Sequence, residues 1–385
     1  MKKICFITTI SATLKAFVID TATYLYENGE YDITFICDTD EEFAGTLPYY
    51  FNYIPVSMKR GISISGIGAI LKMLSLFKKE KFDMVQYSTP NASFYASIAA
   101  KLAGVPVRLY CQWGIVYVGF SGFKRKVFKA IEKIVCFFST WIEPDSFGNL
   151  SFSRLEGLYT EQKSSVVWNG SASGVNLKKF DILYKDKWRK EIRSKYDIAD
   201  TIFVMGFVGR ITRDKGVNEL FVACNEFFEE HPNSALMLLG DKEKSETIDD
   251  EFYQWSIAEQ RVIYCGITNE VEKYLSAMDV FILPSYREGF GSVVIEAEAM
   301  GVPVIVTDIP GPTGAMLNGE TGLVVKKADV ESLKKAMIFL MKDSKKRQEM
   351  GKKGHSFVND NFDSLKLIEY ILQDRNRLLE NSSVK

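Results

Sequence analysis

Two stretches in the second half of the chain combine charged residues with glycines. In the stretch 206–216, GFVGRITRDKG, the cations Arg210 and Lys215 lie in a turn that follows an apolar run. Main-chain N–H groups at the start of a helix bind anions, while arginine grips two phosphate oxygens and lysine adds a point charge. The stretch therefore predicts a phosphate site, although a solvated basic turn would explain the same residues.

The stretch 285–300, SYREGFGSVVIEAEAM, places two glutamates eight positions apart. Glu288 follows an apolar run, and the glycines after it let the backbone approach a ligand closely. Glu296 lies further on, in a helix for which we expect Ser292 to be the cap. The helix dipole alone explains a glutamate near a helix N-terminus, but it explains neither Glu288 nor the glycines.

Short apolar runs alternate with helix-period stretches along most of the chain. The predicted strands are 4–9, 33–38, 84–89, 107–113, 141–146 and 165–170, then 202–210, 235–241, 262–267, 280–285, 302–307 and 322–327. The clearest helical patterns are 92–103, 124–138 and 217–230, and the tail from about 329 is helical throughout. This alternation predicts an α/β fold with two doubly wound, Rossmann-like domains facing a cleft, and ligands at the carboxyl ends of the strands.

The composition sets the number of domains. With 385 residues, of which 46% are hydrophobic and 25% charged, the chain is typical of a globular protein of two or three domains. The polar segment 171–200 breaks the alternation and indicates the junction between two domains. We expect an N-terminal domain over 1–175, a C-terminal domain over 176–360, and a terminal helix over 361–385 that packs back on the first domain.

Charge and cysteine usage exclude several classes of function. A net charge of −1 implies no nucleic-acid partner. The first apolar run predicts a buried strand rather than a signal peptide, and no run reaches the roughly 18 residues of a membrane span. Six scattered cysteines favour reduced thiols in a cytoplasmic protein. The only histidines, His231 and His355, are poorly placed for nucleophilic or metal chemistry.

Together the two glycine-rich stretches resemble the retaining GT-B glycosyltransferases. This large family, glycosyltransferase family 4-like, includes sucrose synthases and bacterial transferases of capsule, O-antigen and lipid-linked glycans. Its pattern G-R-x4-K-G matches residues 209–216, and its Glu-x7-Glu element with E-G-F-G matches residues 288–296. Asn169-Gly170 is similar to the asparagine-glycine at the family's interdomain crossing, so the resemblance covers most of the chain.

The resemblance implies a site for a nucleotide-sugar donor, a UDP-sugar. Arg210 and Lys215 would hold the diphosphate and stabilise it as a leaving group, and Glu288 would contact the donor sugar; these three are the expected catalytic residues. Glu296 would accept hydrogen bonds from the ribose hydroxyls. Further donor contacts are implied for Gly209, Gly266, Ile267, Phe290, Gly291, Gly311 and Thr313, with Gly266 and Ile267 at the base.

On the acceptor side the chain departs from many relatives, which carry a histidine there. The comparable stretch has Gln112 and Trp113, which would position a sugar rather than move protons. The departing phosphate oxygen would then take the acceptor proton. Asn169 is the third residue expected on this side, and a place in the apolar core is an equally good interpretation of Trp113.

No metal or other cofactor is expected, because the two cations would neutralise the leaving group. The stretch Asp38-Thr-Asp40 spells a metal-binding pair of an unrelated transferase fold, but a solvated loop is the preferred interpretation. The stretch 61–68, GISISGIG, lacks the Lys-Ser/Thr of a phosphate-binding loop and is expected to be a flexible loop.

A basic, amphipathic helix is predicted over 122–138, with Glu132 as the single acid on its polar side. More cations gather upstream, around Lys59 and Arg60 and at the end of the helix that precedes residue 82. Such a surface suits peripheral contact with the inner face of the cytoplasmic membrane, and a polyprenyl-diphosphate-linked glycan acceptor. An ordinary soluble basic face explains it equally well. The cations on the predicted helix are Lys124, Arg125, Lys126, Lys129 and Lys133.

We therefore predict a metal-independent, retaining glycosyltransferase. It would move a hexose or N-acetylhexosamine from a UDP-sugar to a hydroxyl of a lipid-linked glycan in bacterial surface polysaccharide synthesis. A UDP-N-acetylglucosamine 2-epimerase is the first alternative, which the scarcity of histidine disfavours. A non-catalytic, two-lobed sugar-binding protein is the second, and such proteins are generally exported.

Overall fold

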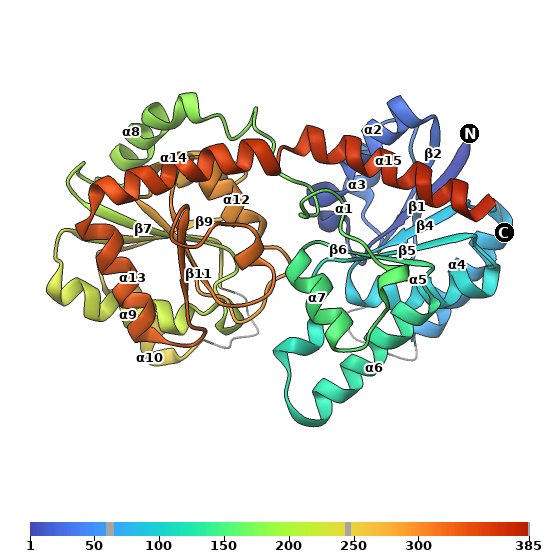
Figure 1. Cartoon of the computed structure of the whole chain (residues 1–385), viewed down its shortest axis with the longest axis horizontal. Helices are drawn as coiled ribbons and strands as arrows, with labels where there is room; N and C mark the ends of the chain where they lie inside the picture. The colour runs from blue at the N-terminus through green and yellow to red at the C-terminus, as the bar shows by residue number, and fades with distance from the viewer. Residues whose placement is uncertain (59–64, 243–247, 384–385) are drawn as a thin grey trace. The chain divides into compact units, whose positions relative to one another are not determined.

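The protein, described by a computed structural model over residues 1–58, 65–242 and 248–383, contains two compact units. The first comprises Met1–Ser173 together with Leu365–Lys385, and the second comprises Gly174–Ser364 (Figure 1). Each unit holds one six-stranded parallel sheet between two layers of helices. The predicted fold class, two doubly wound α/β halves, is confirmed.

The sheet of the first unit has the strand order β3-β2-β1-β4-β5-β6. Alternate residues of a strand face opposite sides, so Cys5 and Ile7 belong to one core and Ile4 and Phe6 to the other. The strands are β1 (Lys2–Ile7), β2 (Tyr31–Cys37), β3 (Asn52–Pro55), β4 (Met84–Tyr87), β5 (Val107–Gln112) and β6 (Trp141–Pro144). The helices are α1 (Ser11–Phe17), α2 (Ile19–Gly29), α3 (Glu41–Thr46), α4 (Ser65–Glu80), α5 (Pro90–Ala103), α6 (Gly122–Phe138) and α7 (Phe147–Leu155).

The last helix, α15 (Ser364–Ser383), completes the first unit (Figure 1). Its Arg375 is buried and forms a two-pronged ion pair with Glu143 of β6, with N–O distances of 2.5 and 3.1 Å. The Nε of Arg375 also donates to Gln86 of β4 at 3.1 Å. The chain therefore returns to its first sheet after the second unit is finished.

The sheet of the second unit has the strand order β12-β11-β10-β7-β8-β9, which repeats the connectivity of the first. Helices α8, α11, α12 and α14 form one layer, and α9, α10 and α13 form the other (Figure 1). The strands are β7 (Phe203–Val208), β8 (Ser234–Leu239), β9 (Val262–Gly266), β10 (Val280–Leu283), β11 (Val304–Thr307) and β12 (Gly322–Val325). The helices are α8 (Lys185–Lys195), α9 (Val217–Glu230), α10 (Asp250–Ala258), α11 (Val271–Ala277), α12 (Ser292–Ala299), α13 (Val330–Lys342) and α14 (Ser344–Asn361).

The predicted strand at 165–170 is wrong. Trp168 and Gly170 adopt positive φ angles of 48° and 95°, which an extended strand does not allow. The apolar residues of this segment pack as an irregular connection, with Val167 against Leu367 and Ile371 of α15. Conversely, β3 was not predicted, because this short edge strand is half-exposed and shows no apolar run.

Three further local predictions, on a helix cap, a loop and an aspartate, also need correction. Gly291 occupies the N-cap position of α12, so Ser292 is the first residue of the helix rather than its cap. Among the residues that the structure describes, no side-chain hydrogen bond caps this helix. Of the expected loop 61–68, residues 65–68 belong to α4. Residues 61–64 lie outside the described residues, and so do the cations Lys59 and Arg60. Asp40 is the N-cap of α3 and accepts a bond from the N–H of Phe43 at 2.9 Å.

All six cysteines are unpaired, and five of them are buried. Among the described helices, none combines the length and the apolar character that a membrane span requires.

Candidate functional site

The switch point of the second sheet lies between β7 and β10, where the chain direction across the sheet reverses. In such sheets ligands bind beyond the carboxyl ends of the strands at this point. Gly209 and Arg210 directly follow β7, and Glu288 follows β10. The two predicted motifs therefore meet at the place where this topology leaves a crevice.

Gly216 fixes the loop after β7 against the end of β10. Its φ is +73°, and a Cβ atom there would lie 1.9 Å from the carbonyl oxygen of Pro284. Only glycine allows this close approach. The glycine thereby sets the distance between the two loops that carry the candidate catalytic residues.

Lys215 and Glu288 form an ion pair across this junction, with 2.6 Å between Lys215 Nζ and Glu288 Oε1. The hydroxyl of Ser285 donates to the same carboxylate oxygen, also at 2.6 Å. The two charged side chains are only 18% and 11% exposed. Two residues predicted from separate motifs are thus in direct contact, and a third, unpredicted residue orients the carboxylate.

Arg210 is the more exposed of the two cations. Its Nη2 lies 3.5 Å from Oδ2 of Asp214, which also pairs with Arg287 at 3.0 Å and accepts from Thr212 at 2.6 Å. Burial alone would raise the pKa of Asp214, but the Thr212 hydrogen bond and the cations of Arg287 and Arg210 outweigh it and lower this pKa. The loop therefore keeps an ionised acid between two arginines.

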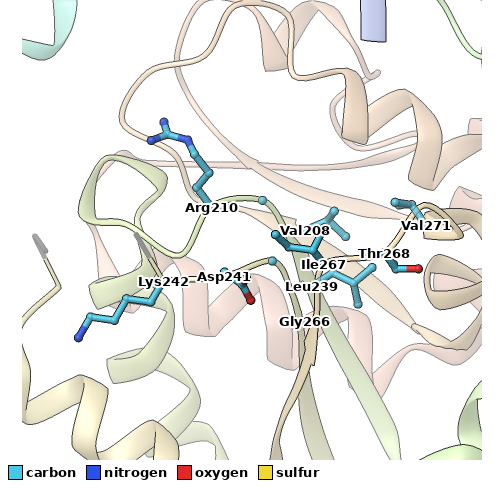
Figure 2. Close-up of a pocket in the computed structure, with 11 residues that line it drawn as sticks. Val208, Arg210, Leu239, Asp241, Lys242, Gly266, Ile267, Thr268 and Val271 are labelled. Atoms are coloured by element: carbon cyan, nitrogen blue, oxygen red, sulfur yellow. The ribbon is translucent and has the colours of Figure 1, made fainter. Parts of the chain in front are cut away.

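A pocket of about 350 Å³ opens at the carboxyl ends of β7, β8 and β9 (Figure 2). Four of the predicted donor residues line it: Gly209, Arg210, Gly266 and Ile267. Gly240 brings two of these strand ends together, since a Cβ atom there would lie 2.0 Å from the carbonyl oxygen of Gly209. The lining residues that the sequence did not indicate are Val208, Leu239, Gly240, Asp241, Lys242, Thr268 and Val271.

The loop after β11 packs on the loop that carries Glu288. Gly311 has a φ of +102°, and a Cβ atom there would lie 1.9 Å from the carbonyl oxygen of Gly289. The side chain of Phe290 is buried against Phe362, with ring centroids 5.3 Å apart, so only its backbone faces the loop. Thr313 donates to the carbonyl of Ile309 at 3.0 Å. The predicted residues of both loops are therefore neighbours.

Glu296 lies in the second turn of α12 rather than at its start. Burial raises the pKa of Glu296 to about 7, with Lys179 opposing the shift and Glu272 adding to it. The helix dipole therefore does not explain this glutamate, because its surroundings disfavour the charged form.

Gln112 does not reach the surface. It is fully buried, donates to Glu132 at 2.6 Å and accepts from Tyr159 at 2.8 Å and Ser153 at 3.1 Å. These partners account for the residue without any ligand, so the structure gives its predicted acceptor contact no support. The buried network is an internal feature of the first unit.

The other two acceptor-side residues lie in the same unit. Trp113 is half-buried and packs on Phe17, with ring centroids 5.5 Å apart. Asn169 precedes Gly170, whose positive φ brings the backbone so close to Asp145 that a Cβ atom would lie 2.6 Å from its carbonyl oxygen. For both residues the acceptor contact stays a prediction.

The predicted basic helix is α6, but Glu132 is not on its polar side. Glu132 turns inward, where it accepts from Tyr110 at 2.9 Å as well as from Gln112, and burial raises its pKa. The outer side of α6 instead exposes Phe123 and Phe137 beside its cations. In the part of the chain that the structure describes, no three side chains are grouped so that they would hold a metal ion.

Two family models cover most of the chain. Residues 189–357 match the model of glycosyl transferases group 1, and residues 3–146 match that of glycosyl transferase 4-like domains. The boundaries place one model in each unit. The second unit, which carries both charged motifs, matches the group 1 model.

Individual proteins agree with these matches. The chain is 32% identical over 348 residues to the capsular polysaccharide biosynthesis glycosyltransferase CapM of Staphylococcus aureus, covering 90% of this chain and 88% of CapM. It is 26% identical over 369 residues to the UDP-Gal:alpha-D-GlcNAc-diphosphoundecaprenol alpha-1,3-galactosyltransferase of Escherichia coli, covering 90% and 89%. The fold is shared with HepE of Anabaena, solved in complex with UDP-glucose, at a TM-score of 0.80, 17% identity and coverage of 98% and 100%. The chain therefore belongs to the group 1, family 4-like glycosyltransferases and has their GT-B fold.

Proposed function

We propose that the protein transfers a hexose or N-acetylhexosamine from a UDP-sugar to a hydroxyl of a lipid-linked glycan, with retention of configuration and without a metal ion. The observation that carries the proposal is the Lys215–Glu288 ion pair at the switch point, beside an open pocket lined by Arg210. The names of the two relatives support the setting, since one is a capsule transferase and the other uses an acceptor on diphosphoundecaprenol.

The donor would lie along the carboxyl edge of the second sheet. The base enters the pocket at Gly266 and Ile267, and the diphosphate reaches Arg210 and Lys215. Lys215, already held by Glu288, then lies between that carboxylate and the phosphate oxygens. It therefore positions the sugar end and the leaving group through one side chain.

The reaction needs no charged base from the protein. The acceptor oxygen bonds to the anomeric carbon as the bond from that carbon to the phosphate oxygen breaks. The acceptor proton passes to the departing phosphate oxygen, and the cations stabilise the charge that remains on UDP. Glu296 accepts hydrogen bonds from the ribose as a carboxylate, which its pKa of about 7 allows at neutral and higher pH.

The lipid-linked acceptor would bring the protein to the cytoplasmic face of a membrane. The outer side of α6 supports this step, because Phe123 and Phe137 are 80% and 76% exposed beside exposed lysines. Apolar residues would insert at the interface while lysines attract anionic headgroups. Sedimentation with vesicles of anionic and of neutral phospholipid measures this contact, and equal sedimentation with both would exclude the electrostatic part.

A panel of nucleotide sugars tests the donor. Binding raises the melting temperature with the logarithm of ligand concentration over Kd, so at equal concentration the true donor is expected to stabilise more than UDP-sugars that differ in one hydroxyl. The best stabiliser is then incubated with and without a glycan acceptor. We expect release of UDP only with the acceptor. An epimerised sugar formed without any acceptor would instead identify a 2-epimerase, and no release in either case would identify a binding protein.

A further inference from the structure

A second pocket of about 440 Å³ lies in the second unit, at the amino edge of its sheet. Asp279 and Pro303, which precede β10 and β11, line it together with residues of α8 and α14. The donor residues Gly209 and Glu288 follow strands of the same parallel sheet, so they lie at the opposite edge. The pocket therefore belongs to neither charged motif.

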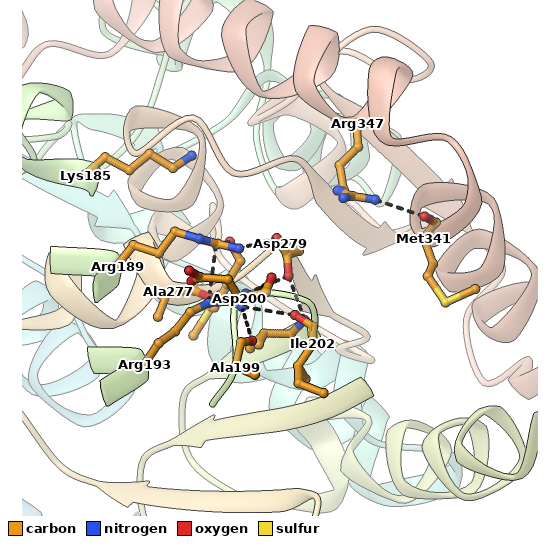
Figure 3. Close-up of polar contacts among 12 residues, drawn as sticks. Lys185, Arg189, Arg193, Ala199, Asp200, Ile202, Ala277, Asp279, Met341 and Arg347 are labelled. Atoms are coloured by element: carbon orange, nitrogen blue, oxygen red, sulfur yellow. Dashed lines mark hydrogen bonds and ion pairs between the residues drawn. The ribbon is translucent and has the colours of Figure 1, made fainter. Parts of the chain in front are cut away.

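Cations from two helices converge on this pocket (Figure 3). Lys185 and Arg189 are four residues apart on α8, and therefore share one face of that helix. Arg347 and Lys352 come from α14. Against these four cations, the lining contains only the carboxylates of Asp186 and Asp279.

The charge of Asp279 is already engaged. Arg189 and Arg193 donate to its two carboxylate oxygens at 2.9 and 2.8 Å, and the N–H of Val204 donates at 2.8 Å. This cluster fastens α8 to the starts of β7 and β10. Of the two acids that line the pocket, only the exposed Asp186 lies outside this cluster.

Lys185 and Arg347 donate hydrogen bonds to main-chain carbonyls and not to carboxylates of the described residues. Lys185 Nζ donates to the carbonyl of Gly301 at 2.8 Å, and Arg347 Nη1 donates to the carbonyls of Leu340 and Met341 at 2.5 and 3.1 Å. Over the described ranges, neither forms an ion pair. Both side chains are partly buried and neither has an ion-pair partner in the described part of the chain, so their charges carry a desolvation cost.

The pKa of Lys185 reflects this cost. Burial is the main reason that this pKa is lowered to about 8; the neighbouring cation of Arg189 adds to the shift, and Asp279 and Asp186 oppose it. A bound anion would reverse both effects, because it supplies the missing counter-charge and accepts the remaining N–H groups.

We propose that this pocket is a binding site for a small phosphate-bearing anion of about the size of a diphosphate. Lys185 and Arg347 contact its oxygens from opposite helices, with Lys352 at the rim, while the Arg193–Asp279 pair holds the helix in place. The site is separate from the proposed donor site and does not depend on it.

Calorimetric titration of the full chain with inorganic pyrophosphate tests the proposal. We expect saturable binding that the double substitution Lys185→Gln and Lys352→Gln weakens by about tenfold or more. The matched control, Lys187→Gln with Lys190→Gln, removes two exposed charges of α8 outside the pocket and is expected to leave the affinity unchanged. The same titration in the presence of saturating UDP is also expected to give this affinity, since the proposed donor site lies at the other edge of the sheet.

Three outcomes would overturn the proposal: no saturable binding by the unmodified chain, equal weakening in the control, or loss of binding when UDP is present. Lys352 is exposed, so Lys352→Gln by itself is a second variant that leaves packing intact. Unchanged affinity in a folded Lys185→Gln variant and in Lys352→Gln would contradict the site equally. Failure of the nucleotide-sugar panel has no bearing on this result.

Discussion

The two sheets share one strand order but differ at their switch points. Between β1 and β4, the N–H of Thr9 donates to the hydroxyl of Thr89 at 3.0 Å, and the two hydroxyls lie 2.8 Å apart. Between β7 and β10, the ion pair of Lys215 with Glu288 stands beside an open pocket. One connectivity thus carries a hydrogen-bonded pair of threonines at the switch point of one unit and a charged candidate ligand site at that of the other.

The same contrast extends to the buried polar groups. In the first unit, Gln112, Glu132 and Arg375 find their partners inside the unit. In the second, Arg210 and the main chain around Gly266 line the pocket. The residues at the strand ends, rather than the topology, therefore decide whether polar groups stabilise the fold or remain available to a ligand.

We expect the largest effect, on the free energy of unfolding, from breaking the buried ion pair of the first unit. Arg375→Met removes one partner of a buried ion pair and leaves Glu143 uncompensated, which is expected to lower the free energy of unfolding by about 3–5 kcal/mol. Urea denaturation measures the change. Arg377→Met, on an exposed arginine of the same helix, is the control, and we expect little change from it. If the two variants lost the same free energy of unfolding, the buried ion pair would not stabilise the fold more than the exposed one does.

We expect the next largest effect from disturbing the contact between the loops after β7 and β10 in the second unit. Gly216→Ala would place a Cβ atom 1.9 Å from the Pro284 carbonyl oxygen at a positive φ, and is expected to cost about 3 kcal/mol and to weaken UDP binding. Gly319→Ala has a similar φ of +76° with open space around it, so only the backbone strain of about 1–2 kcal/mol remains. If both variants lost the same stability and UDP affinity, the close approach would not matter.

Removing the cations tests the chemistry of the open junction. Lys215→Ala is expected to reduce turnover by about hundredfold, because it removes a contact to the charge on the leaving group. Arg210→Ala is expected to act in the same direction, whereas the exposed Lys335→Ala should leave kcat unchanged. Unchanged turnover in both Lys215→Ala and Arg210→Ala would remove the diphosphate assignment.

We expect the smallest effect from the pH dependence of stability, which differs between buried acids with and without a cationic partner. Burial raises the pKa of Glu298 on α12 from 4.5 to about 8, whereas Glu143 in the first unit has an arginine partner. A raised pKa in the folded state gives stability that is fully present below about 4.5 and is lost as the pH rises through about 8. Between pH 5 and pH 6 we expect a loss of about 1 kcal/mol, measured by denaturation at each pH.

Glu298→Gln is expected to flatten this pH dependence, and the exposed Glu320→Gln should retain it. Glu296, whose pKa is about 7, accounts for a remaining part of the slope. A slope that Glu298→Gln leaves unchanged would assign the whole effect to another group.

Most of the fold follows from the sequence because buried parallel strands appear as continuous apolar runs. The runs at 202–210 and 235–241 predict β7 and β8 to within two residues at each end. The failures have local causes. The segment 165–170 is as apolar as a strand, but it packs as a turn with positive φ angles, and β3 lies at an edge where few residues are buried.

The candidate site was predictable where charge and glycine coincide. Arg210, Lys215 and Glu288 stand out because apolar runs end directly before their loops. Ser285 and Gly240 did not stand out, because their roles depend on contacts between strands far apart in the chain. Gln112 and Glu132 were misplaced for the opposite reason: a polar residue in a sequence suggests exposure, whereas both are satisfied inside the core.

Helix α15 makes the order of synthesis matter for folding. The second unit is continuous in sequence, so all of its residues leave the ribosome before residue 365. The first unit begins earlier yet lacks Arg375, the partner of Glu143, until the last turns of the chain emerge. Its closing contacts join residues 232 and 289 positions apart, which is a slow, long-range step. Glu143 therefore lacks its arginine partner until α15 has emerged, after the whole second unit.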